Sequence, residues 1–252
     1  MLKIRLIPML LLKEGRMIKT KQFHSFRDVG NPKTVAKVYN AQKADELIFL
    51  DISATDEKRG FLLEVIRSVA EECLIPITAG GGVRNMEQAR ELLQSGADKV
   101  SINTAAIEDP SFIKKLSEKF GKSTVVVSID YKKNDNGQNE VFVCRGKKST
   151  GFDPVSWARK VEELGAGEIL LTSIDKEGMM MGYDLETIKL VSEAVSIPVI
   201  ASGGAGTVQD LVDSIEIGRA SAVAAASIFH FTDQSIIKGH SFMRSAGLSV
   251  RI

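Results

Sequence analysis

The sequence predicts an α/β protein built as a (β/α)8 barrel. Three observations lead to this fold class: eight short β-branched segments alternate with amphipathic segments, the alternation takes about 250 residues, and two stretches of the chain repeat each other. A doubly wound parallel sheet is the main alternative, but that fold normally uses fewer strands. Because no proline- or glycine-rich linker divides the chain, residues 1–252 are expected to form a single barrel domain.

The expected strands follow one another at regular spacing, and segments of helical period lie between most of them. The strands are residues 4–10, 46–51, 75–79, 99–102, 124–130, 168–172, 197–201 and 222–226. Asn85 and Asp153 have the character of helix N-caps, and Gly96 and Gly165 of helix stops. After the first strand, residues 13–21 are expected to form a polar loop.

Residues 131–150 interrupt the alternation after the fifth strand. They contain "DNG", a turn signal for a β-hairpin, followed by the alternating segment "EVFV". The sequence therefore predicts a hairpin inserted at this point of the barrel.

An internal repeat relates the third and fourth strands to the seventh and eighth. The stretch that begins "PITAGGGVRN" aligns without a gap with the stretch that begins "PVIASGGAGT". Gly81 then matches Gly203, and Gly82 matches Gly204. A duplication of a half-barrel explains the match and predicts two similar sites on opposite sides of one barrel mouth.

The repeated glycine motifs, "AGGGVRN" and "SGGAGT", each follow a strand and precede a helix. Glycine allows the backbone to approach an anion closely, and free amides at a helix start bind phosphate. The next strands end in "INTAA" and "AAASI", which add small residues and a hydroxyl group. The alternative is that both motifs are tight turns that need glycine. Two copies at matched positions favour a ligand that carries a phosphate at each end.

Several charged residues are candidates for chemistry at the mouth. Asp130 ends the fifth strand, where a carboxylate can act as a general acid or base, although it could instead cap the following loop. Lys19 lies in the expected polar loop, which could close over an anionic substrate or simply be a solvated run of charge. Asp175 follows the sixth strand and is as consistent with a turn as with a ligand.

Four further charges mark the opposite end of the barrel. Arg5, Glu46, Lys99 and Glu168 lie at or near strand starts, which all meet at the bottom face. Because their signs alternate, they could pair as a ring around the barrel axis, and such a ring could simply plug the core.

Composition excludes several functional classes. The 33 basic and 32 acidic residues give a net charge of +1, which argues against a general nucleic-acid surface. No apolar run is long enough for a transmembrane helix. Cys73 and Cys144 form no CxxC pair and are consistent with a reducing cytoplasm, and His24, His230 and His240 have no metal-ligand spacing. No metal or cofactor is expected.

Taken together, these motifs resemble the cyclase subunit of imidazole glycerol phosphate synthase. The resemblance covers almost the whole chain, through "GRMIKT", "DELIFLDISAT", "AGGGVRN", "GADKVSINTAA", "VVVSID", "GAGEILLTSID" and "ASGGAG". It implies a barrel with two phosphate sites and a HisH-type glutaminase docked on its bottom face as a heterodimer. Ammonia released by the glutaminase would pass through the barrel and react at the top with a phosphorylated ribulosyl aminoimidazole carboxamide.

The resemblance also assigns roles to individual residues. It implies an ammonia gate at Arg5, Glu46, Lys99 and Glu168, and phosphate sites at Gly82, Asn103 and Thr104 and at Gly178, Gly204, Ala226 and Ser227. It makes Lys19 the lysine of a mobile loop and Asp130 one of two catalytic aspartates. The family's acidic residue after the sixth strand falls on Glu177, next to the unusual run Met179, Met180 and Met181.

One departure from the family is expected to matter most. The second catalytic aspartate falls on Leu11, which cannot transfer a proton. This change, with "IPMLLLK" and "KTKQF", resembles a paralogous branch associated with surface-polysaccharide genes. There the barrel is thought to deliver ammonia to a separate sugar amidotransferase that forms an amidine. The alternatives are an authentic cyclase of histidine biosynthesis and a non-catalytic phosphate-binding module.

Overall fold

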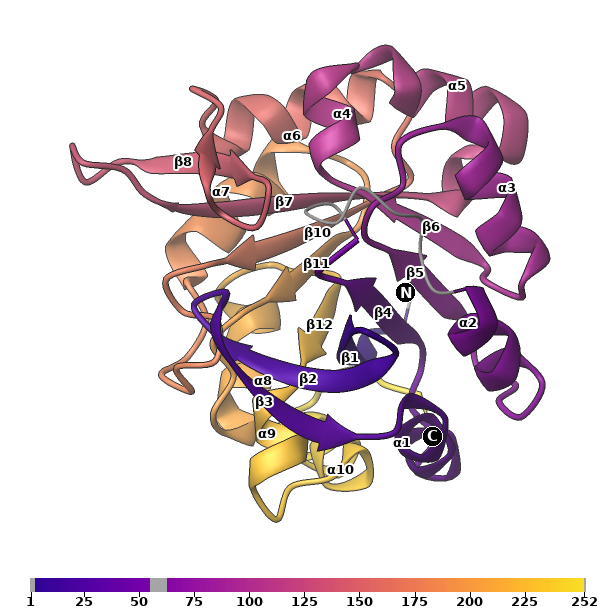
Figure 1. Cartoon of the computed structure of the whole chain (residues 1–252). Helices are drawn as coiled ribbons and strands as arrows, with labels where there is room; N and C mark the ends of the chain where they lie inside the picture. The colour runs from indigo at the N-terminus through magenta and orange to yellow at the C-terminus, as the bar shows by residue number, and fades with distance from the viewer. Residues whose placement is uncertain (1–2, 55–62, 252) are drawn as a thin grey trace.

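Eight parallel strands close into a barrel in the computed structural model, which describes residues 3–54 and 63–251 (Figure 1). The strands are β1 (Arg5–Lys13), β4 (Leu47–Asp51), β5 (Ile77–Gly80), β6 (Lys99–Ile102), β7 (Val125–Lys133), β10 (Glu168–Ser173), β11 (Val199–Ser202) and β12 (Ala222–Ala225). Each pairs in parallel with the next, and β12 pairs with β1, which closes the sheet. The predicted (β/α)8 barrel is confirmed.

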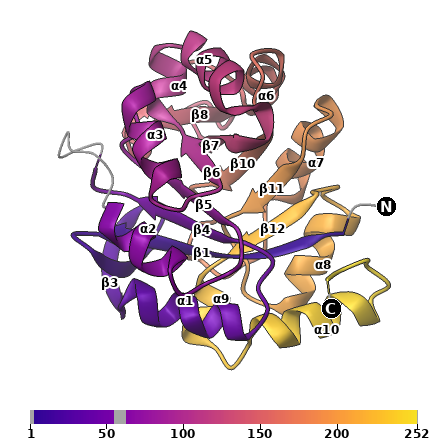
Figure 2. The ribbon, with the colours of Figure 1, turned by 90° about the vertical axis from the view of Figure 1, so that its right-hand side faces the viewer.

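Helices surround this barrel on its outer side (Figure 2). They are α1 (Pro32–Ala41), α2 (Leu63–Ala70), α3 (Met86–Gln94), α4 (Thr104–Glu108), α5 (Ser111–Phe120), α6 (Pro154–Glu163), α7 (Leu185–Ala194), α8 (Val208–Glu216), α9 (Ser227–Phe231) and α10 (Ile236–Ser245), with a 3-10 turn at Lys122–Thr124. The predicted N-caps are confirmed, because the side chains of Asn85 and Asp153 accept hydrogen bonds from the first-turn amides of α3 and α6. Gly96 and Gly165 follow these helices with positive φ angles of 103° and 97°.

Two apolar layers are buried in the molecule. The larger one packs the helices against the outside of the strands. The smaller one fills the barrel interior, and its members are Ile7, Met9, Leu11, Ile18, Ile48, Val126, Leu170, Ile200, Ala222 and Ala224. Side chains alternate along a strand, so β1 directs every second residue from Arg5 to Leu11 to the same face, the inside of the barrel. In the described part of the chain, no helix combines the length and apolar character needed to cross a membrane.

The predicted polar loop after the first strand is wrong. The first strand continues to Lys13 and turns back into β2 (Arg16–Lys21), which pairs with β3 (His24–Gly30). Glu14 and Gly15 adopt positive φ angles of 50° and 76°, as a two-residue hairpin turn requires. The turn is stabilised because Met17 and Ile18 on β2 are buried. This hairpin crosses one end of the barrel (Figure 1).

The predicted insertion after the fifth strand is confirmed as a hairpin. Strand β7 extends past the barrel to Lys133 and pairs antiparallel with β8 (Asn139–Val143), which pairs with β9 (Lys148–Ser149). Asp130 lies opposite Phe142 in this pairing. The insertion therefore begins at the residue that the sequence marked for acid–base chemistry.

The matched glycines of the repeat have the same backbone geometry. Gly81 and Gly203 have positive φ angles of 104° and 89°. A Cβ atom on Gly81 would lie 2.1 Å from the carbonyl oxygen of Asp51, and one on Gly203 would lie 2.6 Å from that of Ser173. Any larger residue would clash with the end of the neighbouring barrel strand, which is β4 for Gly81 and β10 for Gly203. The repeat thus preserves two equivalent turns at the barrel mouth.

Candidate functional site

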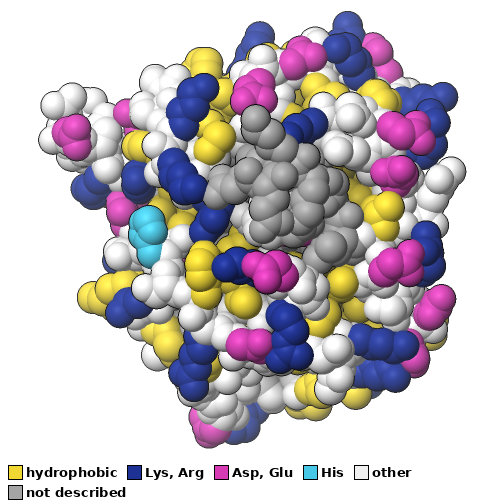
Figure 3. Space-filling view, in the orientation of Figure 1, with side chains coloured by type: hydrophobic (Ala, Val, Ile, Leu, Met, Phe, Trp, Pro, Cys, Tyr) yellow, Lys and Arg dark blue, Asp and Glu magenta, His cyan; other side chains and the backbone are white. Residues whose placement is uncertain are grey.

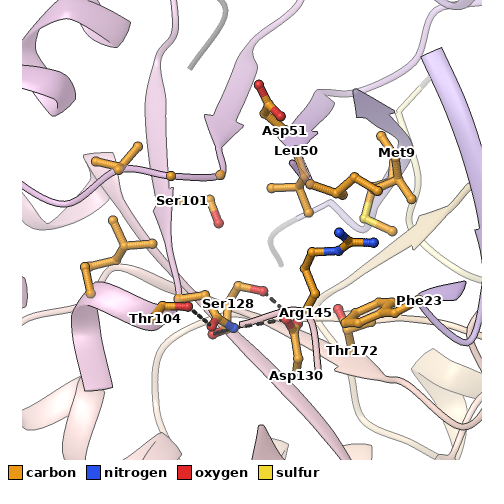
Figure 4. Close-up of a pocket in the computed structure, with 18 of the residues that line it drawn as sticks. Met9, Phe23, Leu50, Asp51, Ser101, Thr104, Ser128, Asp130, Arg145 and Thr172 are labelled. Carbon is orange, nitrogen blue, oxygen red and sulfur yellow. Dashed lines mark hydrogen bonds between the residues drawn. The ribbon is translucent and has the colours of Figure 1, made fainter. Parts of the chain in front are cut away.

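A cavity of about 120 Å³ opens at the carboxyl ends of the strands (Figure 4). Its lining includes Gly82, Asn103 and Thr104, which are the residues expected at the first phosphate site. Asp130 and Leu11 line the same cavity. The structure therefore brings together the loop expected to bind the first phosphate, the candidate acid–base residue and Leu11, on which the resemblance placed the second aspartate.

Asp130 occupies a buried position with a defined set of hydrogen bonds. Ser128 Oγ donates to its Oδ1 atom at 3.0 Å, and Asn103 Nδ2 donates to Oδ2 at 3.0 Å (Figure 4). Burial raises the pKa of Asp130 to about 7, although the hydrogen bonds from Ser128 and Thr172 act in the opposite direction. A carboxyl group with this pKa exists in both protonation states near neutral pH, as general acid–base catalysis requires.

Asp130→Asn is expected to stabilise the fold at pH 8 and to have less effect at pH 5. The folded-state pKa of Asp130 lies above its unfolded value, so its ionisation opposes folding as the pH rises toward 7. Urea unfolding of both proteins at the two pH values measures the difference. Leu190→Ala, at an exposed position of helix α7, is a control that should show no such pH dependence. An Asn variant that is equally destabilised at both pH values would contradict the raised pKa.

Leu11 lies inside the barrel and faces the mouth. Its side chain is 5 % exposed, belongs to the interior apolar layer with Met9 and Ile18, and lines the cavity. Asp51 lines the same cavity, and its Oδ1 atom accepts hydrogen bonds from the Ser53 and Ala54 amides, which hold the turn after β4. The end of β1 thus presents an aliphatic surface to any ligand in the mouth.

The second group of expected phosphate-site residues lines a smaller cavity of about 20 Å³. Gly178, Gly204, Ala226 and Ser227 lie around it. Lys19 and Glu177 complete the lining, and Met9 borders both this cavity and the larger one. The residues that the sequence placed at two anion sites therefore form two separate groups at one barrel mouth.

Lys19 is not on a loop but on strand β2, and it is 5 % exposed. Its ammonium group is bonded to the Glu177 carboxylate and donates to the Thr20 carbonyl oxygen at 2.8 Å. Burial lowers the pKa of Lys19 to about 8. Lys19 is therefore a fixed cation beside the second cavity in this structure.

Glu177 also holds the tip of the β2–β3 hairpin. Its Oε2 atom accepts a hydrogen bond from the Phe23 amide at 3.1 Å, and its carbonyl oxygen accepts one from the Gln22 amide at 2.9 Å. Gln22 and Phe23 have positive φ angles of 51° and 63°, which side chains rarely adopt. The sequence did not indicate this contact, because Glu177 and the hairpin are separated by more than 150 residues.

The four charges at the bottom of the barrel form a closed ring of ion pairs. Glu46 contacts Arg5 at 2.7 Å and Lys99 at 2.9 Å, and Glu168 contacts both cations at 3.1 Å. Burial opposes the charge of Arg5, but Glu168 and Glu46 outweigh it and raise the pKa of Arg5. A depression of about 520 Å³ lies over this ring, with Arg5, Glu46 and Lys99 in its lining.

The remaining candidates have structural contacts. Asp175 accepts a hydrogen bond from the Lys133 amide at 2.9 Å and so supports the inserted hairpin. His240 Nε2 lies 2.8 Å from Asp45, and His230 Nδ1 lies 3.1 Å from the Tyr39 hydroxyl. Among the described residues, no group of three His, Cys, Asp or Glu side chains could hold a metal ion. Met181 is exposed on the loop after β10.

Among the cavity residues that the sequence did not single out are Arg145 and Thr20. Both line the larger cavity, although neither belongs to a barrel strand. Arg145 follows β8 in the inserted hairpin, and only the three-dimensional path of that hairpin carries it to the mouth.

On the face that the β2–β3 hairpin crosses, acidic and basic side chains are interspersed (Figure 3).

Comparison with known proteins agrees with this architecture. Residues 5–235 match the family described as "Histidine biosynthesis protein". The chain is 47 % identical, over 251 residues and the full length of both proteins, to the imidazole glycerol phosphate synthase subunit HisF of Alkaliphilus metalliredigens (strain QYMF). By this match over residues 5–235 and this full-length similarity, the chain belongs to the histidine biosynthesis protein family as a HisF-type member.

Proposed function

We propose that this chain is the ammonia-accepting barrel of a glutamine amidotransferase. The main support for this proposal is a closed ring of ion pairs at the bottom of the barrel, formed by Arg5, Glu46, Lys99 and Glu168. An open depression on the bottom face lies over this ring. A polar floor can bind ammonia, and the apolar interior above it favours a small neutral molecule over ammonium. Ammonia entering at the floor would reach the mouth at Asp130.

The proposed partner is a HisH-type glutaminase, bound to the bottom face as a heterodimer. The depression over the ring exposes charged side chains, including Lys3 and Arg251, that could pair with such a partner. The proposed ligand of the mouth is a small molecule with phosphates at both ends. The two cavities, with Gly82, Asn103 and Thr104 around one and Gly178, Gly204, Ala226 and Ser227 around the other, support this proposal.

The first candidate reaction is that of imidazole glycerol phosphate synthase in histidine biosynthesis. It would convert the phosphorylated ribulosyl aminoimidazole carboxamide and ammonia into imidazole glycerol phosphate and an aminoimidazole carboxamide ribotide. The full-length similarity to a HisF subunit supports this candidate. Asp130, with a pKa near 7, would move protons during ring closure and cleavage.

The second candidate is delivery of ammonia to a separate sugar amidotransferase in surface-polysaccharide biosynthesis. The observation that favours it is Leu11, which gives the mouth an aliphatic wall in place of a second acid. The barrel would then act mainly as a conduit, and the amidine would form on the partner enzyme. The family assignment does not extend to this pathway.

Turnover by the purified chain distinguishes the two candidates. The chain is supplied with ammonium and the phosphorylated ribulosyl intermediate, and loss of the intermediate is followed. Turnover at about 1 s⁻¹ or more, which is ordinary for enzymes, would identify the histidine-pathway reaction. Ligand binding with neither turnover nor stimulation of a glutaminase would instead indicate a non-catalytic module. Gene neighbourhood gives an independent test, because histidine genes favour the first candidate and polysaccharide genes the second.

Lys99→Ala is expected to increase the fraction of ammonia that escapes to solvent. Lys99 bridges Glu46 and Glu168, so its loss opens one side of the ring without removing a member of the apolar core. Free ammonia released per glutamine hydrolysed is measured in the complex with the glutaminase and compared with wild type. Lys114→Ala, at an exposed position of helix α5, is the matched control. Unchanged escape in both Lys99→Ala and Arg5→Ala would argue against a gate.

A further inference from the structure

Two hairpins that are not part of the barrel meet over the larger cavity. A Cβ atom on Gly146, after β8, would lie 3.6 Å from the Phe23 ring at the tip of the β2–β3 hairpin. The Phe26 ring on β3 lies 5.4 Å from the Arg145 guanidinium carbon and 4.3 Å from the Lys13 ammonium. Each hairpin therefore supports the other across the mouth.

Thr20 on β2 contributes a buried hydroxyl group to this region. The residue lines the larger cavity and is 4 % exposed. Within residues 3–54 and 63–251, its Oγ1 atom has no hydrogen-bond partner. Buried hydroxyl groups are nearly always satisfied, so an unsatisfied one beside a cavity needs an explanation. A ligand in the cavity supplies one.

Arg145 approaches the cavity from the other hairpin on a constrained turn. Cys144 and Arg145 both adopt left-handed backbone conformations, with φ angles of 52° and 60°. The turn is held from two directions, because the Cys144 amide donates to Thr104 Oγ1 at 3.2 Å and Lys132 Nζ donates to the Gly146 carbonyl oxygen at 2.9 Å. The Arg145 side chain extends into the cavity, on the side where Met9 and Phe23 lie (Figure 4).

We propose that Thr20 and Arg145 form a recognition subsite for the sugar portion of a phosphorylated sugar. The phosphate would occupy the loop formed by Gly82, Asn103 and Thr104, which is the part of this inference that rests on the proposed function. The Thr20 hydroxyl would then pair with a hydroxyl or carbonyl oxygen of the sugar, and the guanidinium fork of Arg145 would donate to further oxygen atoms. Leu11 and Met9 contact the carbon chain between them.

This subsite gives the two hairpins a role in specificity. Inorganic phosphate would bind the glycine loop without reaching Thr20, whereas a phosphorylated sugar would contact both. Lys19, the neighbour of Thr20 on β2, is bonded to the Glu177 carboxylate, so the hydroxyl is held on a strand that is anchored beside the cavity. Discrimination between the two ligands is therefore the property that the subsite should control.

The test compares binding of ribulose 5-phosphate and inorganic phosphate to the full chain by calorimetry. Thr20→Val keeps the shape of the side chain and removes the hydroxyl, and Thr20→Ser is the rescue control. Thr20→Val is expected to weaken ribulose 5-phosphate binding about 3- to 10-fold, the usual effect of losing one neutral hydrogen bond, and to leave phosphate binding unchanged. Thr20→Ser should bind both probes nearly as the wild type does.

Two further measurements separate recognition from a structural role. Without ligand, Thr20→Val should unfold at a higher temperature than wild type, because it removes an unsatisfied buried group. Arg145→Met should weaken ribulose 5-phosphate binding by about 10-fold or more, since the bonds that it removes are charge-assisted. A fall in the unfolding temperature of Thr20→Val, or an equal loss of affinity for both probes, would overturn the subsite.

Failure of the subsite and failure of the proposed function give different results. If wild type binds both probes and neither Thr20→Val nor Arg145→Met reduces the preference for ribulose 5-phosphate, only the subsite is wrong. If wild type binds neither probe, the phosphate-binding mouth of the proposed function is wrong, and the subsite is rejected with it.

Discussion

Leu11→Asp is expected to raise ammonium-dependent turnover of the phosphorylated ribulosyl intermediate by about 10²–10⁴-fold if the mouth lacks only a second proton-transfer group. Leu11 on β1 borders the cavity in which Asp130 lies, so a carboxylate there would face the same ligand. Ring closure and cleavage need proton transfer at separate atoms, which one carboxyl group serves poorly. Consumption of the intermediate by purified protein measures the gain.

The control for this experiment is Leu11→Asn, which has nearly the same shape but cannot transfer a proton. Both variants place a polar group among Met9, Ile18 and other apolar side chains, so both are expected to be less stable than wild type. Comparing the turnover rates of the two variants corrects for the loss of stability that they share. If Leu11→Asp is no faster than Leu11→Asn, the mouth has diverged beyond this one residue, and delivery of ammonia to another enzyme becomes the better explanation.

Glu46→Gln is expected to lower the free energy of unfolding by about 3–5 kcal/mol. The Glu46 side chain is 2 % exposed, and its carboxylate contacts Arg5 at 2.7 Å and Lys99 at 2.9 Å. It also accepts a hydrogen bond from the Thr78 hydroxyl. Removing its charge leaves two partly buried cations to share Glu168 alone. Urea unfolding, with the slope of the transition checked for constancy, measures the loss.

Two controls test whether charge is the cause. Glu168→Gln should cost less, because Glu168 is 13 % exposed and water can solvate the cations that it leaves. Adding Lys99→Met to Glu46→Gln restores the balance of charge and should recover part of the loss. A decrease below about 1 kcal/mol for Glu46→Gln would mean that the ring is solvated like a surface ion pair. The electrostatic account of the barrel floor would then be wrong.

Much of the fold was predictable because its signals are local. Strand and helix periods, the N-caps Asn85 and Asp153, and the turn signal of the β7–β8 hairpin depend on neighbouring residues. The turn from β1 into β2 was not recognised, since Glu14 and Gly15 form a weak turn signal and polar residues follow them. An expected mobile lysine therefore proved to be a buried strand residue, Lys19.

The site was predictable only where the barrel topology dictates the position of a residue. Strand ends converge in any such barrel, so the sequence alone assigns Asp130, Leu11 and the glycine loops to the mouth. By the same argument, the sequence placed four charged residues together at the bottom face: Arg5, Glu46, Lys99 and Glu168. The roles of these residues stay predictions, which the experiments above address.

The sequence by itself determined the barrel, the order of its strands and which residues lie at its two ends, because side-chain alternation and strand polarity are properties of the chain. Only the tertiary structure decided how the mouth is closed. Glu177 accepts a hydrogen bond from the tip of a hairpin more than 150 residues away. Thr20 and Arg145 line one cavity from two different hairpins. Such contacts depend on how separate loops pack, and packing between distant segments leaves no periodic signal in the sequence.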